Sequence, residues 1–95
     1  MTDPVIIWFS GGPGCTSLLG FSEESGPYIN VVESPGLSKN DYAWNQEANM
    51  IYLDNPAGVG YSVCGDPEEC KYDDKTAADD NLQAVLALLA EFKEI

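Results

Sequence analysis

The segment Val5-Ile6-Ile7-Trp8-Phe9 constrains the fold most, because five apolar residues run without a break into a glycine-rich turn. A short apolar run that ends in turn residues is typical of a strand buried on both faces of a sheet. The turn combines residues that permit unusual backbone angles with one that stiffens the chain: Gly11, Gly12, Pro13 and Gly14. We therefore predict a rigid loop at the end of a central strand, with backbone N–H groups available to an anion.

A second apolar run at residues 50–53 ends in Asn55-Pro56-Ala57-Gly58, which has the chemistry of a turn. The two runs suit neighbouring strands of one sheet. Between them, residues 16–22 are predicted to form a short helix capped by Thr16 or Ser17, and residues 28–32 have the composition of a strand.

The remaining connections are predicted from their turn residues and polarity. Ser34-Pro35-Gly36 indicates a turn, and residues 36–41 indicate a polar loop. Tyr42-Ala43-Trp44 is predicted to be a short extended piece whose rings fill the edge of the core. Residues 64–74 are acidic and rich in turn residues, so they are predicted to form a surface loop.

The last part of the chain predicts a helix from about residue 76 to residue 93. Thr76 is a favourable N-cap, and Asp79 follows three residues later as in a capping box. Apolar residues then recur at helical spacing on one face, which is expected to pack on a sheet: Leu82, Val85, Leu86, Leu89 and Phe92. A helix that binds a partner protein is the alternative. The order of strands and helices predicts a slice of an α/β fold.

Composition bounds the class of protein. The chain has 95 residues, with 16 Asp and Glu against 4 Lys, and a formal charge of −12. This balance argues against binding to nucleic acids or to anionic membranes. No apolar stretch approaches the 20 or so residues that a membrane span needs, and the first residues do not have the pattern of a signal peptide. No cofactor or metal is expected, since histidine is absent and the acidic residues lack EF-hand spacing.

The chain has three cysteines, so at least one of them is unpaired within it. Cys64 and Cys70 flank Gly65-Asp66-Pro67, a spacing that a disulfide could close in an oxidising compartment. Cys15 is then the odd cysteine, either because its partner lies elsewhere or because it is a buried thiol.

Several motifs in one order make the chain resemble the serine carboxypeptidases, a family of α/β-hydrolases. The glycine-rich segment resembles that family's GGPGCSS loop. The resemblance continues through further segments along nearly the whole chain: Glu24-Ser25-Gly26-Pro27-Tyr28, Tyr42-Ala43-Trp44-Asn45, the stretch at residues 53–62, Lys75-Thr76-Ala77 and Asp80-Asn81-Leu82. It implies that residues 1–95 form a single segment similar to the N-terminal part of a catalytic domain. That segment would be a partial α/β-hydrolase sheet with central strands, a glycine-rich oxyanion loop and one long amphipathic C-terminal helix.

The resemblance also implies roles for individual residues. The backbone N–H of Gly12 matches the family's oxyanion donor. Ser10, Gly11 and Glu24 match residues that bind the C-terminal carboxylate of a peptide, and a glutamate can do this only if one of the two carboxyl groups keeps a proton. Position 10 is usually Asn in the family, so Ser10 is a departure that bears on carboxylate recognition. The cysteine that matches Cys15 commonly pairs with one far downstream.

The chain lacks two parts of the catalytic apparatus. It has no histidine for a Ser-His-Asp triad and no G-x-S-x-G nucleophile elbow, so we expect it to be inactive alone. The resemblance implies that the complete enzyme removes C-terminal residues from peptides through an acyl-enzyme, in a secreted, lysosomal or vacuolar location. Related family members use the same acyl-enzyme chemistry as acyltransferases, which is an alternative activity. The remainder of the hydrolase domain, or a partner chain, would complete it. The alternative is a short non-catalytic homologue that acts as a binding or assembly protein.

Overall fold

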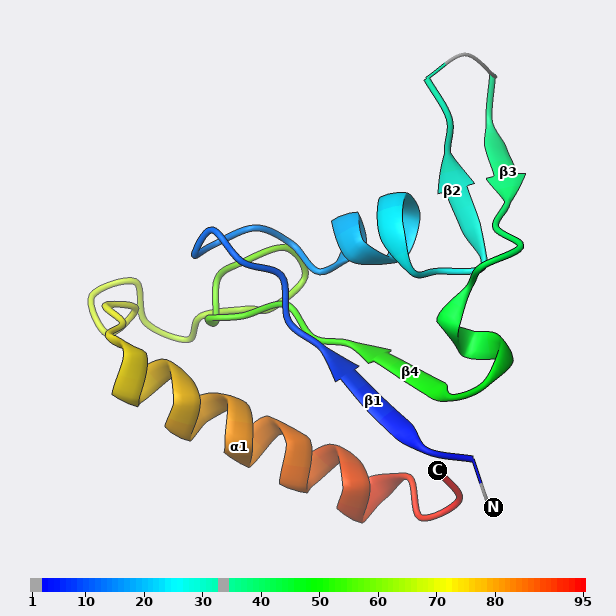
Figure 1. Ribbon diagram of the computed structural model, residues 1–95. Helices are drawn as coiled ribbons and strands as arrows, with labels where there is room; N and C mark the ends of the chain where they lie inside the picture. Colours follow the sequence, from blue (N-terminus) through cyan, green and yellow to red (C-terminus); the bar gives the residue numbers. More distant parts are fainter. Residues whose placement is uncertain (1–2, 33–34) are drawn as a thin grey trace.

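The computed structural model describes residues 3–32 and 35–95, and at its centre lies a two-stranded parallel sheet (Figure 1). Strand β1 (Val5–Trp8) pairs with β4 (Asn49–Tyr52), with Val5 opposite Asn49 and Trp8 opposite Tyr52. The two apolar runs are thus neighbours in one sheet, as predicted. Each strand ends one residue earlier than its apolar run, and both open into a loop at the same edge of the sheet.

The helix α1 (Asp74–Glu91) covers one face of this sheet (Figure 1). Ile7 and Ile51 on the strands meet Ala84, Val85 and Leu88 on the helix. Of the five apolar residues that were predicted to pack on the sheet, only Val85 does so. The side of α1 that contacts the sheet is rotated about the helix axis relative to the predicted one. The other four residues are about half exposed: Leu82, Leu86, Leu89 and Phe92.

Aromatic side chains cover the opposite face of the sheet. Trp8 meets Trp44 edge to face, with ring centroids 5.6 Å apart, and Tyr52 meets Phe21 in the same way at 5.4 Å. The Tyr52 hydroxyl also forms a 2.9 Å hydrogen bond with the buried Ser25 hydroxyl. Because side chains alternate along β1 and β4, Ile7 and Ile51 face the helix, whereas Trp8 and Tyr52 face the other side.

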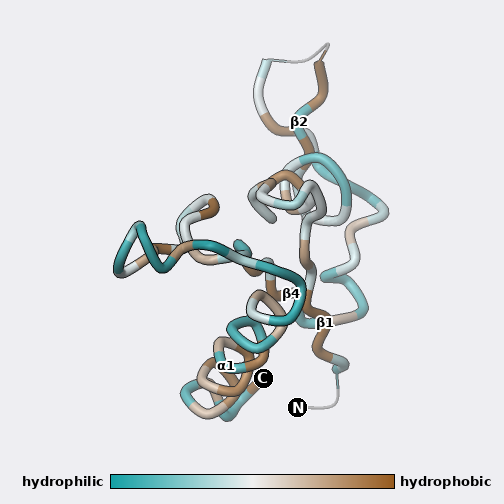
Figure 2. Tube along the Cα trace, turned by 90° about the vertical axis from the view of Figure 1, so that its left-hand side faces the viewer, coloured by the Kyte–Doolittle hydropathy of each residue, from teal (hydrophilic) through white to brown (hydrophobic). Residues whose placement is uncertain are grey.

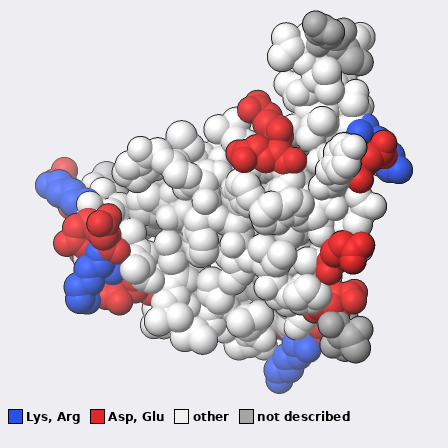
Figure 3. Space-filling model, viewed as in Figure 1, with Lys and Arg blue, Asp and Glu red and all other residues white. Residues whose placement is uncertain are grey.

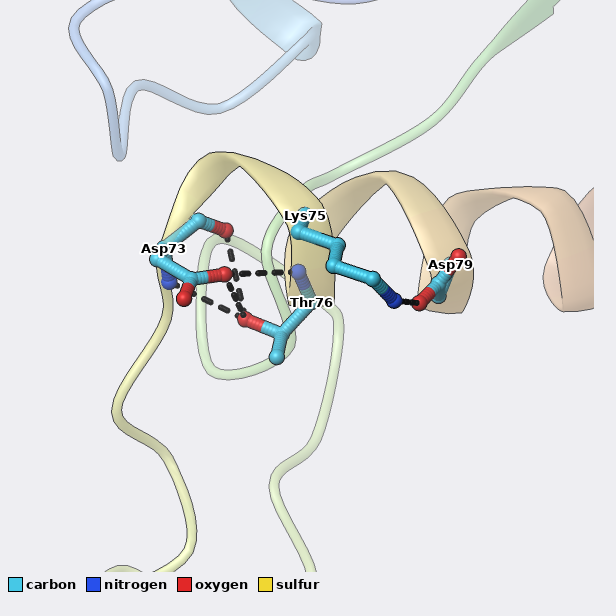
Figure 4. Close-up of polar contacts among 4 residues, drawn as sticks. All are labelled: Asp73, Lys75, Thr76 and Asp79. Carbon is cyan, nitrogen blue, oxygen red and sulfur yellow. Dashed lines mark hydrogen bonds and ion pairs between the residues drawn. The ribbon is translucent and has the colours of Figure 1, made fainter.

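The first turn of α1 is capped by Asp73, not by Thr76 as predicted (Figure 4). The Asp73 carboxylate accepts a 2.8 Å hydrogen bond from the Thr76 backbone N–H, and the Thr76 hydroxyl accepts a 3.0 Å bond from the Asp73 backbone N–H. This reciprocal pair is a capping box in which Thr76 occupies the third helical position. Asp79 instead pairs with Lys75 at 2.6 Å.

Two connecting segments differ from their predictions. Residues 36–41 were predicted to be a loop, but they contain β3 (Leu37–Lys39), which pairs antiparallel with β2 (Tyr28–Asn30). Hydrogen bonds across the hairpin satisfy its backbone in spite of its polar sequence. The predicted turn at residues 34–36 lies partly outside the described residues. Figure 1 shows the hairpin projecting from the body of the molecule.

The segment at residues 42–44 was predicted to be extended, but it leads into the short 3₁₀ helix η2 (Trp44–Gln46). The Asn40 side chain accepts a hydrogen bond from the Tyr42 N–H at 3.0 Å, and the Gln46 side chain donates to the Asp41 carbonyl at 2.9 Å. These local bonds curl the chain. The first helical turn begins at residue 18, later than predicted, and continues as the π-helix η1 (Gly20–Glu24).

The molecule buries little of its apolar surface. Among the described residues, only Ala43 and Ala48 are buried apolar side chains. The accessible surface is 6899 Å², against about 5,400 Å² for a compact monomer of 10.3 kDa. Figure 2 shows hydrophobic residues along both strands and along α1. On the face of the molecule seen in Figure 3, charged side chains lie mainly at the margins.

Candidate functional site

Residues 10–17, here called the glycine loop, follow β1 and form a projecting turn. Its five central residues, 11–15, are exposed, and one internal hydrogen bond joins the Cys15 N–H to the Gly11 carbonyl at 3.3 Å. Gly12 has a φ of 137°, which an L side chain rarely adopts. A Cβ at this position would also lie 3.0 Å from the Gly14 nitrogen and 3.2 Å from the Cys15 sulfur. The loop therefore requires glycine at residue 12.

Ser17 ties both ends of the loop to the end of β4. Its side chain is fully buried, and its hydroxyl donates to the Leu53 carbonyl at 2.6 Å. The same oxygen accepts a 3.1 Å hydrogen bond from the Ser10 N–H at the start of the loop. One hydroxyl thus joins the first residue of the loop, its last residue and the neighbouring strand.

Asp54 makes a second connection, directly after β4. One oxygen of its carboxylate accepts hydrogen bonds from the Ser17 N–H at 2.6 Å and the Thr16 hydroxyl at 2.7 Å. The other oxygen accepts from the Tyr61 N–H at 2.8 Å. Gly60 is needed beside it, because a Cβ there would overlap the Asp54 carboxylate.

These donors favour the ionised form of Asp54. The Tyr61 N–H lowers the pKa of its carboxyl most, partial burial opposes this, and the Thr16 hydroxyl and Ser17 N–H lower the pKa further. Because the folded pKa lies below the unfolded one, the Asp54 contribution to stability is present above the unfolded pKa and is lost as the pH falls through the folded one.

We therefore expect the stability difference between the native protein and Asp54→Asn to depend on pH. It should be constant above about pH 5, where Asp is ionised in both states, and shrink below about pH 4. Urea unfolding of both proteins across pH 2.5–7 measures it. A difference that stays constant to the lowest pH, or that already shrinks near pH 6, contradicts this prediction.

The structure places three of the four predicted binding residues together, since Ser10, Gly11 and Gly12 are consecutive in the loop. Within the described residues, the N–H groups of Gly11 and Gly12 donate to no protein acceptor. The Ser10 hydroxyl accepts a 3.2 Å bond from the Trp8 indole N–H, which leaves its own proton free to donate. Glu24 is exposed at the end of η1, and no described contact joins its side chain to the loop.

The cysteines divide into a pair and a single thiol. Cys64 and Cys70 are joined by a disulfide, with Cα atoms 6.3 Å apart, within the acidic surface loop. Cys15 is free and exposed on the glycine loop, so it is not the buried thiol that was one of the two interpretations. Its sulfur is therefore accessible to a partner outside these residues.

A pocket of about 470 Å³ lies beside the glycine loop, between it and the first turns of α1. Pro13 and Gly14 form one wall, and Asn55, Pro56 and Asn81 form another. The Asn81 amide donates to the Asn55 side-chain oxygen at 3.1 Å, whereas the buried Asn55 amide nitrogen has no partner among the described residues.

Sequence reasoning missed the importance of Asp54 and Ser17. Ser17 was predicted only as a possible helix cap, and Asp54 was given no role. One signal was available, because a carboxylate directly after a buried strand lies at the edge where neighbouring parallel strands open into their loops. Which donors it meets there depends on the tertiary fold.

Comparison with known sequences and structures identifies the family of this chain. The sequence model of the family described as serine carboxypeptidase matches residues 1–95. The chain belongs to the serine carboxypeptidase family. Serine carboxypeptidase-like 36 of Arabidopsis thaliana is 42% identical over 93 residues, which are 98% of this chain and 19% of that relative.

Other members of the serine carboxypeptidase family match to a similar extent. Serine carboxypeptidase ctsa-3.1 of Caenorhabditis elegans is 46% identical over 85 residues, which cover 88% of this chain and 15% of that protein. The chain thus spans about a fifth, or less, of the length of these relatives.

A solved carboxypeptidase has a similar fold. The crystal structure of Kex1(delta)p, a prohormone-processing carboxypeptidase from Saccharomyces cerevisiae, superposes with a TM-score of 0.75 at 29% identity. The match covers 97% of this chain and 20% of that one. Within the described residues, no helix has the length and apolar character required to cross a membrane.

Proposed function

We propose that this serine carboxypeptidase segment supplies part of the active site of an enzyme that removes C-terminal residues from peptides through an acyl-enzyme. Residues 1–95 act as one segment of its catalytic domain. The observation that carries the proposal is the glycine loop, whose ends are held by Ser17 and Asp54 and whose Gly11 and Gly12 N–H groups have no protein acceptor among the described residues.

In this proposal the Gly12 N–H stabilises the negative oxygen that forms when a nucleophile attacks the scissile carbonyl. A donor that is already fixed in place stabilises that charge without reorganising, which lowers the barrier more than it tightens substrate binding. The histidine and the nucleophilic serine come from outside this chain, because the chain has neither a histidine nor a G-x-S-x-G nucleophile elbow.

Ser10, Gly11 and Glu24 are proposed to bind the carboxylate at the end of the peptide. The free N–H of Gly11 and the free hydroxyl proton of Ser10 are adjacent donors for its oxygens. Glu24 joins them when a proton is shared between the two carboxyl groups. Its exposed position at the end of η1 leaves its side chain free to do so.

The remainder of the hydrolase domain is the proposed partner. The radius of gyration is 15.0 Å, against about 12 Å for a compact chain of this length, and the outer residues of α1 leave apolar surface uncovered. A secreted, lysosomal or vacuolar location is proposed from the family, and the Cys64–Cys70 disulfide suits an oxidising route to it.

The test is hydrolysis of matched peptides by the complete gene product. A peptide with a free C-terminal carboxylate should lose its last residue much faster than the same peptide with a C-terminal amide. Equal rates would overturn the carboxylate site. If neither peptide is cleaved, the enzymatic proposal fails and the non-catalytic binding role replaces it.

A further inference from the structure

Asp54 connects three segments that are far apart in the sequence. It follows β4, it accepts two hydrogen bonds from the last residues of the glycine loop, and it accepts one from Tyr61 in the next loop. In addition, its backbone carbonyl accepts a 2.6 Å bond from the Ser62 hydroxyl. No other carboxylate in the described part of the chain is bonded to residues 10–17 in this way.

We infer that Asp54 is a positioning residue, which holds the glycine loop in the orientation that aims the Gly12 N–H at the reacting carbonyl. The inference rests on the proposed function. We do not expect Asp54 to contact the substrate, because its carboxylate already accepts hydrogen bonds from Thr16, Ser17 and Tyr61. It acts only through the loop.

The loop depends on its ends for its orientation. Between Ser10 and Thr16 its central residues are exposed, and the internal bond from Cys15 to Gly11 does not connect them to the rest of the protein. Two connections remain at its C-terminal end, the Ser17 hydroxyl and the Asp54 carboxylate. Without the hydrogen bonds to Asp54, the loop can tilt about the remaining connection at the Ser17 hydroxyl.

A carboxylate suits these three donors, and an amide does not. Both oxygens of Asp54 accept, one from the Ser17 N–H and the Thr16 hydroxyl and the other from the Tyr61 N–H. An asparagine has nearly the same shape but one oxygen, and its NH₂ group would face a backbone N–H. The substitution therefore weakens the hydrogen bonds by which Asp54 holds the glycine loop and the loop at Tyr61 together, without creating a cavity.

The experiment compares Asp54→Asn with Asp73→Asn in the complete gene product. Asp73 is a matched control, because its carboxylate also accepts from a backbone N–H and a threonine hydroxyl, both of Thr76, but it has no bond to the glycine loop. We expect Asp54→Asn to lower kcat for peptide hydrolysis by about a hundredfold, with KM changed less than about threefold. Asp73→Asn should leave both constants close to native.

Amide hydrogen exchange gives a second readout that needs no activity. In Asp54→Asn the amides of Ser10, Ser17 and Tyr61 should exchange faster than in Asp73→Asn, with the strand amides unchanged. Equal effects of the two substitutions on kcat, or a change in KM alone, would overturn the inference, as would unaltered exchange in the loop. If the native protein hydrolyses no peptide, the proposed function fails, and exchange alone decides whether Asp54 holds the loop.

Discussion

Replacing Gly12 by alanine is expected to lower kcat by about a hundredfold to a thousandfold, the usual effect of losing one oxyanion donor. The backbone at this position has a φ of 137°, and an added Cβ would press on the Gly14 and Cys15 nitrogens at 3.0 and 3.1 Å. The loop must rearrange to accept it. The Gly12 N–H then turns away from the carbonyl, and transition-state stabilisation is lost while substrate still binds.

Steady-state kinetics of the complete gene product on a peptide substrate measure this effect, and Gly36→Ala provides the control. Gly36 also has a positive φ, of 108°, but an added Cβ there meets no atom within 4 Å. Gly36 lies in the projecting hairpin, so Gly36→Ala introduces backbone strain comparable to that of Gly12→Ala without affecting the glycine loop. Gly12→Ala with native kcat, or with a loss no larger than that of Gly36→Ala, would rule out Gly12 as the donor.

Replacing Gly26 by alanine is expected to lower the free energy of unfolding by about 3 kcal/mol or more, at the upper end of what overpacking costs. Gly26 is buried directly after η1, and an added Cβ would overlap the Phe21 carbonyl. That overlap is with the backbone of the π-helix and not with a flexible side chain. Relieving it would displace the Gly26 carbonyl, which accepts a 2.9 Å hydrogen bond from the Asn40 side chain.

Urea denaturation measures this loss, with Gly65→Ala as the matched control. A Cβ at Gly65 meets no atom within 4 Å and its φ is not positive, so stability should change little. If Gly26→Ala is as stable as Gly65→Ala, then the contact between η1 and the segment that follows is looser than the structure shows.

Much of the architecture could be predicted from local sequence. The unbroken apolar runs identified β1 and β4, because a strand covered on both faces must be apolar at every position. The glycine and proline cluster identified the loop, since few other residues adopt its backbone angles. Helix α1 was predicted from its spacing, although its cap was misassigned because Asp73 and Thr76 are both good capping residues.

The short pieces were not predictable in the same way. β3 has the sequence Leu37-Ser38-Lys39, which has little strand propensity, and it becomes a strand only because β2 lies beside it. The curl at Trp44 depends on Asn40, whose amide also donates to the carbonyls of Glu24 and Gly26.

The sequence by itself determined the family, the central strands and the glycine loop, because each can be identified from short segments of contiguous residues. Only the tertiary structure decided which side of α1 meets the sheet and what holds the loop. The reason is physical: Asp54 is 37 residues from Ser17, and a hydrogen bond between residues so far apart exists only once parallel pairing of β1 and β4 brings both loop ends to one edge of the sheet.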